Sequence, residues 1–404
     1  MKQRKSILAK TLALSAVIGV IVGALCALFG RVLLYLSEVR SLHAIWFIPF
    51  LGVAGLISML LYKKCSEESL KGMGLVIETG LGKNEKIPIL LVPLIMVSTW
   101  LTHLFGGSAG REGVAVQLGA TVAHTIGRKA KMPENSRVLL ITGMAAGFAG
   151  LFQTPLTASF FALEVMISGV LLYEALLPAV MAAYIASFTS HFLGLEKFSV
   201  AVNDAFSWTP ETTVKLLFVA AIFGVTGGGF AYLLGKAKKA GVRFFYDPCK
   251  RIFVMGSLLA IVFLLLDYGR YSGLGTNLIS ASFTGEMIYG WDFILKILLT
   301  VLTLAAGYQG GEVTPLFAIG ASLGVVLAKF LGLPILLVAA LGYAAVFGAA
   351  TNTLLAPIFV GLEVFGENHM TCFAVVCIIA YVCSGSQTIY GAQRKYIFQI
   401  QEGE

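Results

Sequence analysis

The stretch GMAAGFAGLFQTPLTASFFALEV at residues 143–165 decides the fold, because it returns without a gap as GYAAVFGAATNTLLAPIFVGLEV at residues 342–364. Two shorter motifs recur in the same order: Gly72-Met73-Gly74-Leu75 as Gly273-Leu274-Gly275-Thr276, and Gly110-Arg111-Glu112 as Gly310-Gly311-Glu312. The copies are offset by 201, 200 and 199 residues, which chance similarity between unrelated apolar segments would rarely produce. The chain is therefore an internal duplication. Repeats that Gly and Pro interrupt at matching positions of two apolar halves point to a transporter whose ligand site lies between the halves.

The composition is that of an integral membrane protein. Hydrophobic residues make up 58% of the 404 residues and charged residues 12%, and the mean hydropathy is +0.87. Soluble domains carry about 25% charged residues. Because no polar linker is long enough to hold a separate domain, we expect one transmembrane transport domain, residues 1–404. Its first repeat half is residues 1–240, and its second, inverted half is residues 241–404.

The apolar segments differ in length. Four of them approach the roughly 20 residues that a spanning helix needs: 12–36, 44–62, 214–234 and 252–266. Glycine and proline cut the others into shorter pieces, and broken helices at membrane depth are tolerated only where they are buried in protein or line an aqueous cavity. The fold prediction is an all-α polytopic membrane protein with an inverted-topology repeat of broken and tilted helices. The breaks predict the ligand site.

The distribution of Lys and Arg predicts the orientation. The N-terminus and the segments 63–71, 128–137 and 236–251 are basic, whereas the second-half counterparts are poor in positive charge. We therefore expect a multi-pass protein of the cell inner (plasma) membrane with both termini cytoplasmic and a retained first helix. The net charge of +8 reflects topology, so no nucleic-acid partner is expected.

Two glycine-rich runs, residues 106–113 and 307–314, precede the apolar segments 114–126 and 315–330. A helix N-terminus presents unpaired backbone N–H groups and partial positive charge, and glycine permits close approach, so both starts predict anion sites. Met73 opens a third short helix in this interpretation. The six cysteines have no metal-site spacing, and no HExxH or GxSxG motif is present. No metal, cofactor or enzymatic activity is expected.

These motifs carry a family resemblance. GSAGREG at 107–113, the stretch 143–165, GYQGGEVTP at 307–315 and SGSQTIY at 384–390 resemble the signature regions of the CLC family of anion channels and anion/proton antiporters. The resemblance implies a CLC-like homodimer with one anion pathway in each subunit. It also implies that Glu112 is the external gating glutamate and that Tyr390 lines the central anion site.

Departures from the common CLC pattern indicate the fluoride/proton antiporter branch. They are Met73 between Gly72 and Gly74, Val114 where a proline is usual, and the polar residues Glu312 and Thr314 where most members are apolar. The resemblance assigns gating and proton transfer to Glu112 and Glu312. It assigns anion binding and selectivity to Met73, Gly110, Gly113, Val114, Thr314 and Tyr390. Because Val165 replaces the family's inner proton-transferring glutamate, Glu312 is considered as its substitute.

Fluoride is small and strongly hydrated, so hydroxyl donors such as those of Thr314 and Tyr390 would add to backbone donors. A deprotonated Glu112 and an anion would exclude each other from one site, which couples fluoride export to inward proton movement. A chloride/proton antiporter or passive anion channel is the alternative; an organic-anion transporter and a membrane enzyme are less well supported. Glu164 and Glu363 are expected to form structural pairs, and His103 to be a packed or interfacial side chain.

Overall fold

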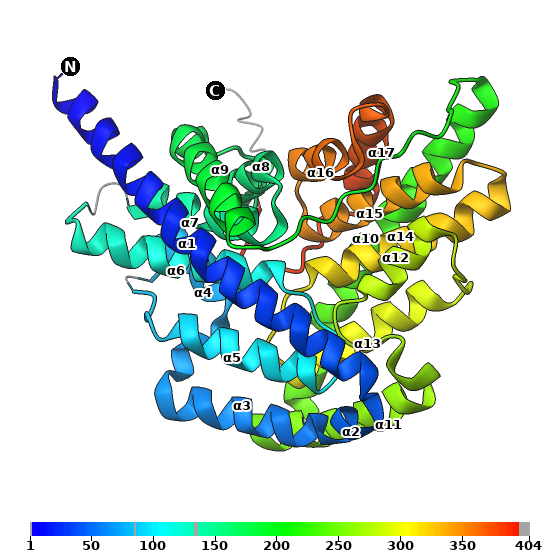
Figure 1. The fold of residues 1–404 in the computed structure, drawn as a ribbon, viewed down its shortest axis with the longest axis horizontal. Helices are drawn as coiled ribbons and strands as arrows, with labels where there is room; N and C mark the ends of the chain where they lie inside the picture. Colours follow the sequence, from blue (N-terminus) through cyan, green and yellow to red (C-terminus); the bar gives the residue numbers. More distant parts are fainter. Residues whose placement is uncertain (1, 85, 133–135, 396–404) are drawn as a thin grey trace, which may run out of the picture.

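The computed structural model describes residues 2–84, 86–132 and 136–395, and this part of the chain is almost entirely helical (Figure 1). The first nine helices are α1 Lys2–Leu42, α2 Ala44–Phe47, α3 Leu51–Cys65, α4 Met73–Gly80, α5 Leu91–Leu104, α6 Glu112–Lys129, α7 Ser136–Phe152, α8 Pro155–Glu164 and α9 Leu176–Phe192. The next eight are α10 Pro210–Phe244, α11 Pro248–Leu265, α12 Thr276–Thr284, α13 Asp292–Ala306, α14 Val313–Leu331, α15 Ile335–Thr351, α16 Leu355–Phe365 and α17 Met370–Cys383.

Helix lengths follow the expected division in part, because two spanning segments, Tyr173–Phe192 and Val313–Leu331, were not among the four expected. Within the described residues, six segments are long and apolar enough to cross a membrane: Ser6–Leu42, Ala44–Cys65, Tyr173–Phe192, Pro210–Phe244, Pro248–Leu265 and Val313–Leu331. Others, such as α8 with 10 residues and α16 with 11, are too short to span a bilayer alone. The predicted all-α architecture of long and broken helices is confirmed.

The two halves contact each other through equivalent residues. Phe160 of α8 stacks on Phe359 of α16, with ring centroids 4.5 Å apart and an interplanar angle of 8°. Glu363 accepts hydrogen bonds from the backbone N–H groups of Leu156 (3.0 Å) and Thr157 (2.8 Å) at the start of α8. In Figure 1, α8 and α9 lie beside α16 and α17 along the upper edge of the molecule. Self-complementary contacts of this kind are the mark of a two-fold relation.

Glu164 makes the reciprocal contact. Its carboxylate accepts hydrogen bonds from the N–H groups of Leu354 and Leu355, both at 2.9 Å, at the start of α16. Each glutamate thus satisfies the unpaired donors of the equivalent helix in the other half. The expected structural pairing of Glu164 and Glu363 is confirmed.

Glycines allow the helices next to these to pack at short range. A Cβ on Gly119 of α6 would overlap the carbonyl oxygen of Gly143 in α7, and a Cβ on Gly320 of α14 would overlap that of Gly342 in α15. Small residues are typical of helix contacts in membranes, where backbones can approach closely. These two tight pairs carry the helix starts that form the candidate site.

The structure corrects the expected division of the chain. The boundary at 240/241 falls inside α10, which runs without a break from Pro210 to Phe244, so we propose the non-helical segment 193–209 as the connection between the halves. The basic residues of 236–243 suggested a loop, but Lys, Arg and Ala are good helix formers and continue the helix. The helices after the glycine runs also begin two residues earlier than expected, at Glu112 and Val313.

The last described segment returns to the centre of the molecule. Strand β2 (Arg394–Lys395) pairs in parallel with β1 (Ile167–Ser168), just after α8. Gln393 donates from its side chain to the carbonyl oxygens of Val165 (3.0 Å) and Thr351 (3.1 Å). These contacts hold Tyr390, three residues before Gln393, between the two halves.

Candidate anion and proton site

The two glycine-rich helix starts meet at the centre of the molecule. Gly110 and Gly311 exchange backbone hydrogen bonds as an isolated antiparallel bridge, with Gly311 N 2.7 Å from Gly110 O. A Cβ on Gly110 would lie 2.9 Å from Pro315 Cδ and 3.0 Å from both Gly311 O and Thr314 N. No other residue fits this approach, which brings the first residues of α6 and α14 together.

Glu112 is the first residue of α6, and its side chain lies at the N-terminus of α14 in the other half. Its side chain is buried, with 1% of its surface exposed. Its Oε2 accepts hydrogen bonds from the backbone N–H of Thr314 (3.1 Å), from the Thr314 hydroxyl, and from the backbone N–H of Arg111 (3.3 Å). Thr314 is the second residue of α14, so the carboxylate of the first half fills the anion site at the helix start of the second half.

The second oxygen of Glu112 has different surroundings. Arg111 Nε lies 3.8 Å from Oε1, within ion-pair range. Among the described residues, Oε1 has no hydrogen-bond partner. One oxygen of the carboxylate is therefore held by three donors, while the other faces the Arg111 guanidinium group.

A cavity of about 470 Å³, here called the Met73 cavity, opens beside this pair of helix starts. Three of the predicted site residues line it: Met73, the first residue of α4, Glu312 and Tyr390. Within the described residues the buried Tyr390 hydroxyl has no hydrogen-bond partner. Glu312 and a tyrosine whose hydroxyl is unpaired among the described residues thus line the same cavity.

Two ion pairs line the Met73 cavity. Lys238 Nζ lies 3.7 Å from Glu312 Oε1, and Lys71 Nζ lies 3.3 Å from Glu78 Oε2. A Cβ on Gly113 would lie 3.8 Å from Glu312 Oε2. The Glu312 carboxylate thus lies between the Lys238 ammonium group and the first turn of α6, which carries Glu112.

Val114 is placed differently from the other predicted site residues. It is fully buried in the core and does not line the Met73 cavity. Its equivalent in the second half, Thr314, contacts Glu112 directly. Val165, which stands where an inner glutamate was sought, is also fully buried. The structure therefore gathers Glu112, Gly110 and Thr314 into one cluster, and Met73, Glu312 and Tyr390 around one cavity.

Sequence reasoning missed Gln117 and Lys238 in the Met73 cavity. Gln117 lies one turn after Gly113 on α6, donates to the Gly113 carbonyl oxygen at 3.1 Å, and has an Oε1 without a partner among the described residues. It also lies against Gly72, where a Cβ would be 3.2 Å from Oε1. A polar side chain inside an apolar helix is costly unless it serves a purpose, so the position of Gln117 was a usable signal, whereas Lys238 lies in a basic stretch and gave none.

Sequence reasoning also missed Lys296, which supports the loop before Glu112. Lys296 is fully buried on α13, and its ammonium group donates to Ser108 Oγ (2.9 Å), Tyr271 O (3.1 Å) and Gly273 O (2.8 Å). All three of its donors are therefore used. His103 lies on the same side of this loop and contacts the carbonyl oxygens of Thr99 and Ala109. It is a packed side chain, as expected.

Comparison with known proteins agrees with this geometry. The family model described as voltage gated chloride channel matches residues 54–385. The chain belongs to the CLC family. It is 36% identical to the chloride/fluoride channel protein of Pseudomonas syringae pv. tomato, covering 96% of this chain and 87% of that protein. The fold of this CLC protein is a polytopic membrane fold of a transport family, and the protein is not an enzyme.

Solved structures extend the comparison. A crystal structure of a CLC-type fluoride/proton antiporter matches this CLC chain with a TM-score of 0.95 and 52% identity, covering 96% of this chain and 98% of the other. A slow cyanobacterial Cl−/H+ antiporter matches with a TM-score of 0.83 at 22% identity, covering 94% and 96%. The second match shows the shared fold alone.

Proposed function

We propose that this CLC protein is a fluoride/proton antiporter that exports cytoplasmic fluoride in exchange for inward protons, with Glu112 as its gate. The observation that carries the proposal is the contact of Glu112 Oε2 with both the N–H and the hydroxyl of Thr314. The similarity to a structurally characterised fluoride/proton antiporter at 52% identity supports the choice of ions.

The contact explains why the two substrates exchange. Fluoride accepts hydrogen bonds and carries negative charge, so it competes with the Glu112 carboxylate for the donors of Thr314. Protonation of Glu112 removes its charge, weakens its hold on those donors and leaves them to fluoride. A small anion is expensive to dehydrate, and a hydroxyl donor beside a backbone N–H offsets part of that cost. Because the carboxylate and the anion exclude each other, the arrangement favours exchange over an open pore.

In this proposal the ion route from Glu112 to the cytoplasm passes through the Met73 cavity. In this proposal Met73, Gly113 and the Tyr390 hydroxyl contact the anion on its way to the cytoplasm, and Glu312 takes over the proton-transferring role that Val165 cannot perform. The pairing of Glu312 with Lys238 at 3.7 Å fits a carboxylate at the mouth of an aqueous route. The basic segments near this side, including Lys71 and Lys238, support a cytoplasmic position for the cavity.

The same charge pattern supports placement in the plasma membrane with both termini cytoplasmic. Residue 1 and residues 396–404 lie outside the described part of the chain, so the proposal for the two ends rests on the sequence.

We also propose that the protein is a homodimer with one anion pathway in each subunit. Counting photobleaching steps of singly labelled protein in dilute lipid bilayers tests this, because a dimer gives two steps and a monomer one.

Flux measurements on purified protein in liposomes test the function. Fluoride efflux down its gradient should drive proton uptake in the opposite direction, recorded together with a fluoride electrode and a pH-sensitive dye. Chloride at the same gradient should give little proton movement. Proton-coupled chloride flux at the fluoride rate would instead support the chloride/proton antiporter, and anion flux without any proton movement would support a passive channel.

A further inference from the structure

A row of exposed side chains runs along the outer face of α1. Val17, Val20, Ile21 and Leu28 are each 41–54% exposed, and their positions i, i+3, i+4 and i+11 place them on one helical face. Branched apolar side chains exposed on a membrane-spanning helix face lipid. The row continues through Arg31 and ends at Tyr35, which is 65% exposed.

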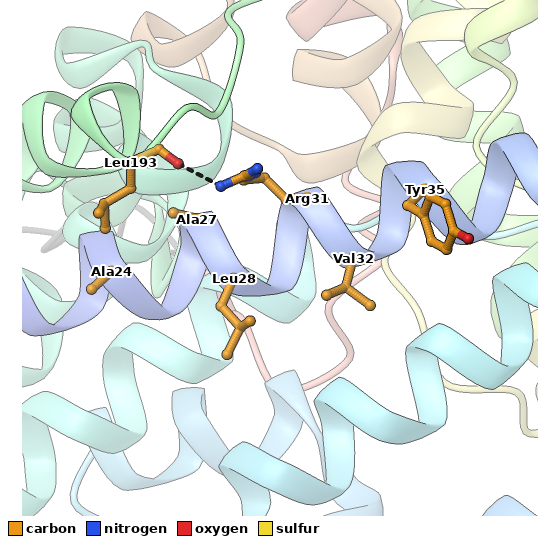
Figure 2. A pocket seen from close by; sticks show the side chains of 7 residues that line it. All are labelled: Ala24, Ala27, Leu28, Arg31, Val32, Tyr35 and Leu193. Atoms are coloured by element: carbon orange, nitrogen blue, oxygen red, sulfur yellow. Dashed lines mark hydrogen bonds between the residues drawn. The ribbon is translucent and has the colours of Figure 1, made fainter.

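A groove of about 520 Å³ lies where the row changes from apolar to polar. Ala24, Ala27, Leu28 and Val32 line it with apolar surface, and Arg31, Tyr35 and Leu193 complete it. Figure 2 shows the lining residues of α1, with Arg31 reaching toward Leu193, which directly follows α9. The groove therefore joins an apolar floor to one cationic group.

Arg31 lacks a charged partner. Its Nη1 donates to the carbonyl oxygen of Leu193 at 3.0 Å, and no carboxylate of the described residues forms an ion pair with it. A guanidinium group has five donors in a planar fork that matches phosphate oxygens. Among the described residues, one hydrogen bond of this group is found, although its charge lies next to the exposed apolar face of α1.

The position of Arg31 along α1 matches that of a boundary of the hydrocarbon core. It follows the start of the apolar run at Leu12 by 19 residues, which is about 28 Å along a helix. The hydrocarbon core is about 30 Å thick, so with a cytoplasmic N-terminus, as proposed above, Arg31 is expected near the far end of the apolar run 12–36, toward the outer leaflet. Tyrosine is enriched at such boundaries, in agreement with Tyr35.

We propose that this groove binds an anionic phospholipid of the outer leaflet, with the phosphodiester on Arg31 and an acyl chain along Leu28 and Ala24. The Tyr35 hydroxyl would donate to the headgroup. Arg31 would then act both as the cap of α9, through Leu193, and as the lipid contact. The proposal is independent of which ion is transported.

Native mass spectrometry of the purified protein in neutral detergent tests the site with phosphatidylglycerol as the probe. Retained phosphatidylglycerol is expected for the unmodified protein, whereas phosphatidylcholine should be retained at least about tenfold less. Arg31→Gln keeps a donor for the Leu193 carbonyl but removes the charge, and it should lose most of the retained lipid. Lys250→Gln is the matched control, because it removes one charge from an exposed position on another face and should retain lipid normally.

Two further arms separate the site from general effects. Leu28→Trp fills the groove and leaves Arg31 intact, and it should also reduce retention, which keeps the test decisive if Arg31→Gln folds poorly. Excess inorganic phosphate should not displace the lipid, because the apolar floor contributes to binding. Equal phosphatidylglycerol retention in Arg31→Gln, Leu28→Trp and the unmodified protein would overturn the proposal, as would equal losses in Arg31→Gln and Lys250→Gln.

Discussion

Met73 and Leu274 are equivalent residues of the two halves, but they lie in opposite surroundings. Met73 lines the Met73 cavity, and a Cβ on its neighbour Gly74 would have no atom within 4 Å. Leu274 is 2% exposed, and a Cβ on its neighbour Gly275 would lie 2.8 Å from Lys296 Cε. One copy of the motif has remained open, and the other has been filled by a buried lysine.

The central motif shows the same divergence. Glu112 and Glu312 are equivalent, yet Glu112 is bound at a helix start of the other half, whereas Glu312 lines the cavity beside Lys238. Val114 and Thr314 are also equivalent, and only Thr314 offers a hydroxyl. The two helix starts are similar, and a few different side chains place a carboxylate at one start and its hydrogen-bond donors at the other.

The largest effect is expected from removing the charge of Glu112. Glu112→Gln fixes a neutral side chain at the α14 helix start, so proton-coupled fluoride transport should be abolished, leaving no transport or an uncoupled anion leak. Simultaneous fluoride and pH recording in liposomes measures it. Normal coupling in Glu112→Gln would remove Glu112 from the gate.

The equivalent change in the second half sharpens the comparison. Severe loss of transport in both Glu312→Gln and Glu312→Ala would indicate that Glu312 acts through its charge or its proton. Near-normal exchange in Glu312→Gln, with loss in Glu312→Ala, would assign it a neutral hydrogen-bonding role. Normal coupled flux in both variants would eliminate Glu312 from the mechanism.

A matched pair of glycine substitutions tests the open and filled motifs. Gly275 has φ +86° and contacts Lys296, so Gly275→Ala should destabilise the fold by roughly 2–4 kcal/mol through backbone strain and overpacking. Gly74→Ala adds a methyl group to open space within α4 and should leave stability nearly unchanged. The apparent melting midpoint of each purified variant in detergent reports the difference. Equal midpoints would mean that the residues around Lys296 rearrange to accommodate the added methyl group without loss of stability.

Removal of the Thr314 hydroxyl should have an intermediate effect. Thr314→Val makes the α14 start resemble the α6 start and removes one donor to the bound anion. Hydrogen bonds to charged groups contribute about 1.5–3 kcal/mol, so we expect fluoride affinity to fall at least about tenfold. Thr314→Ser keeps the hydroxyl and serves as the control. Unchanged concentration dependence of fluoride flux in Thr314→Val would show that the backbone N–H suffices.

The smallest effect is expected at the Met73 cavity. Met73→Ser replaces an apolar wall with a hydroxyl, and the ratio of chloride to fluoride flux should rise several-fold without loss of folded protein. Leu274→Ser is the control at the equivalent position. Leu274 is buried away from the cavity, so this variant should lower stability and leave the ratio unchanged. If Met73→Ser does not change the ratio, selectivity is set near Thr314, Glu312 and Tyr390.

Much of the fold was predictable because it depends on chemistry visible in the sequence. Gly110 and Pro315 mark helix breaks, since free backbone groups in a membrane must be buried or line a cavity, and the breaks do enclose the candidate site. The exact helix starts were misplaced by two residues because Glu112 and Val313 belong to the glycine-rich runs and were assigned to loops. The polar partners of Thr314 could not be predicted, because they come from the other half of the chain.

The buried ammonium group of Lys296 illustrates what could not be predicted from the sequence. A lysine within an apolar segment signals a special role, but its partners Ser108, Tyr271 and Gly273 are spread over more than 160 positions. Only the folded arrangement shows that they converge. Likewise, the basic stretch of α10 suggested a loop, because charge pattern reports topology and not whether a helix continues into water.

The reciprocal glutamate contacts of α8 and α16 constrain how the protein is made. The backbone N–H of Leu156 donates a hydrogen bond to Glu363, which lies 207 residues later in the chain. Ribosomes add about 5–20 residues per second, so α8 waits roughly 10–40 seconds before its partner is synthesised. During that interval its first turn has donors that lipid cannot satisfy. The first half must therefore remain sheltered, by the insertion machinery or by water, and biogenesis depends on the two halves meeting late.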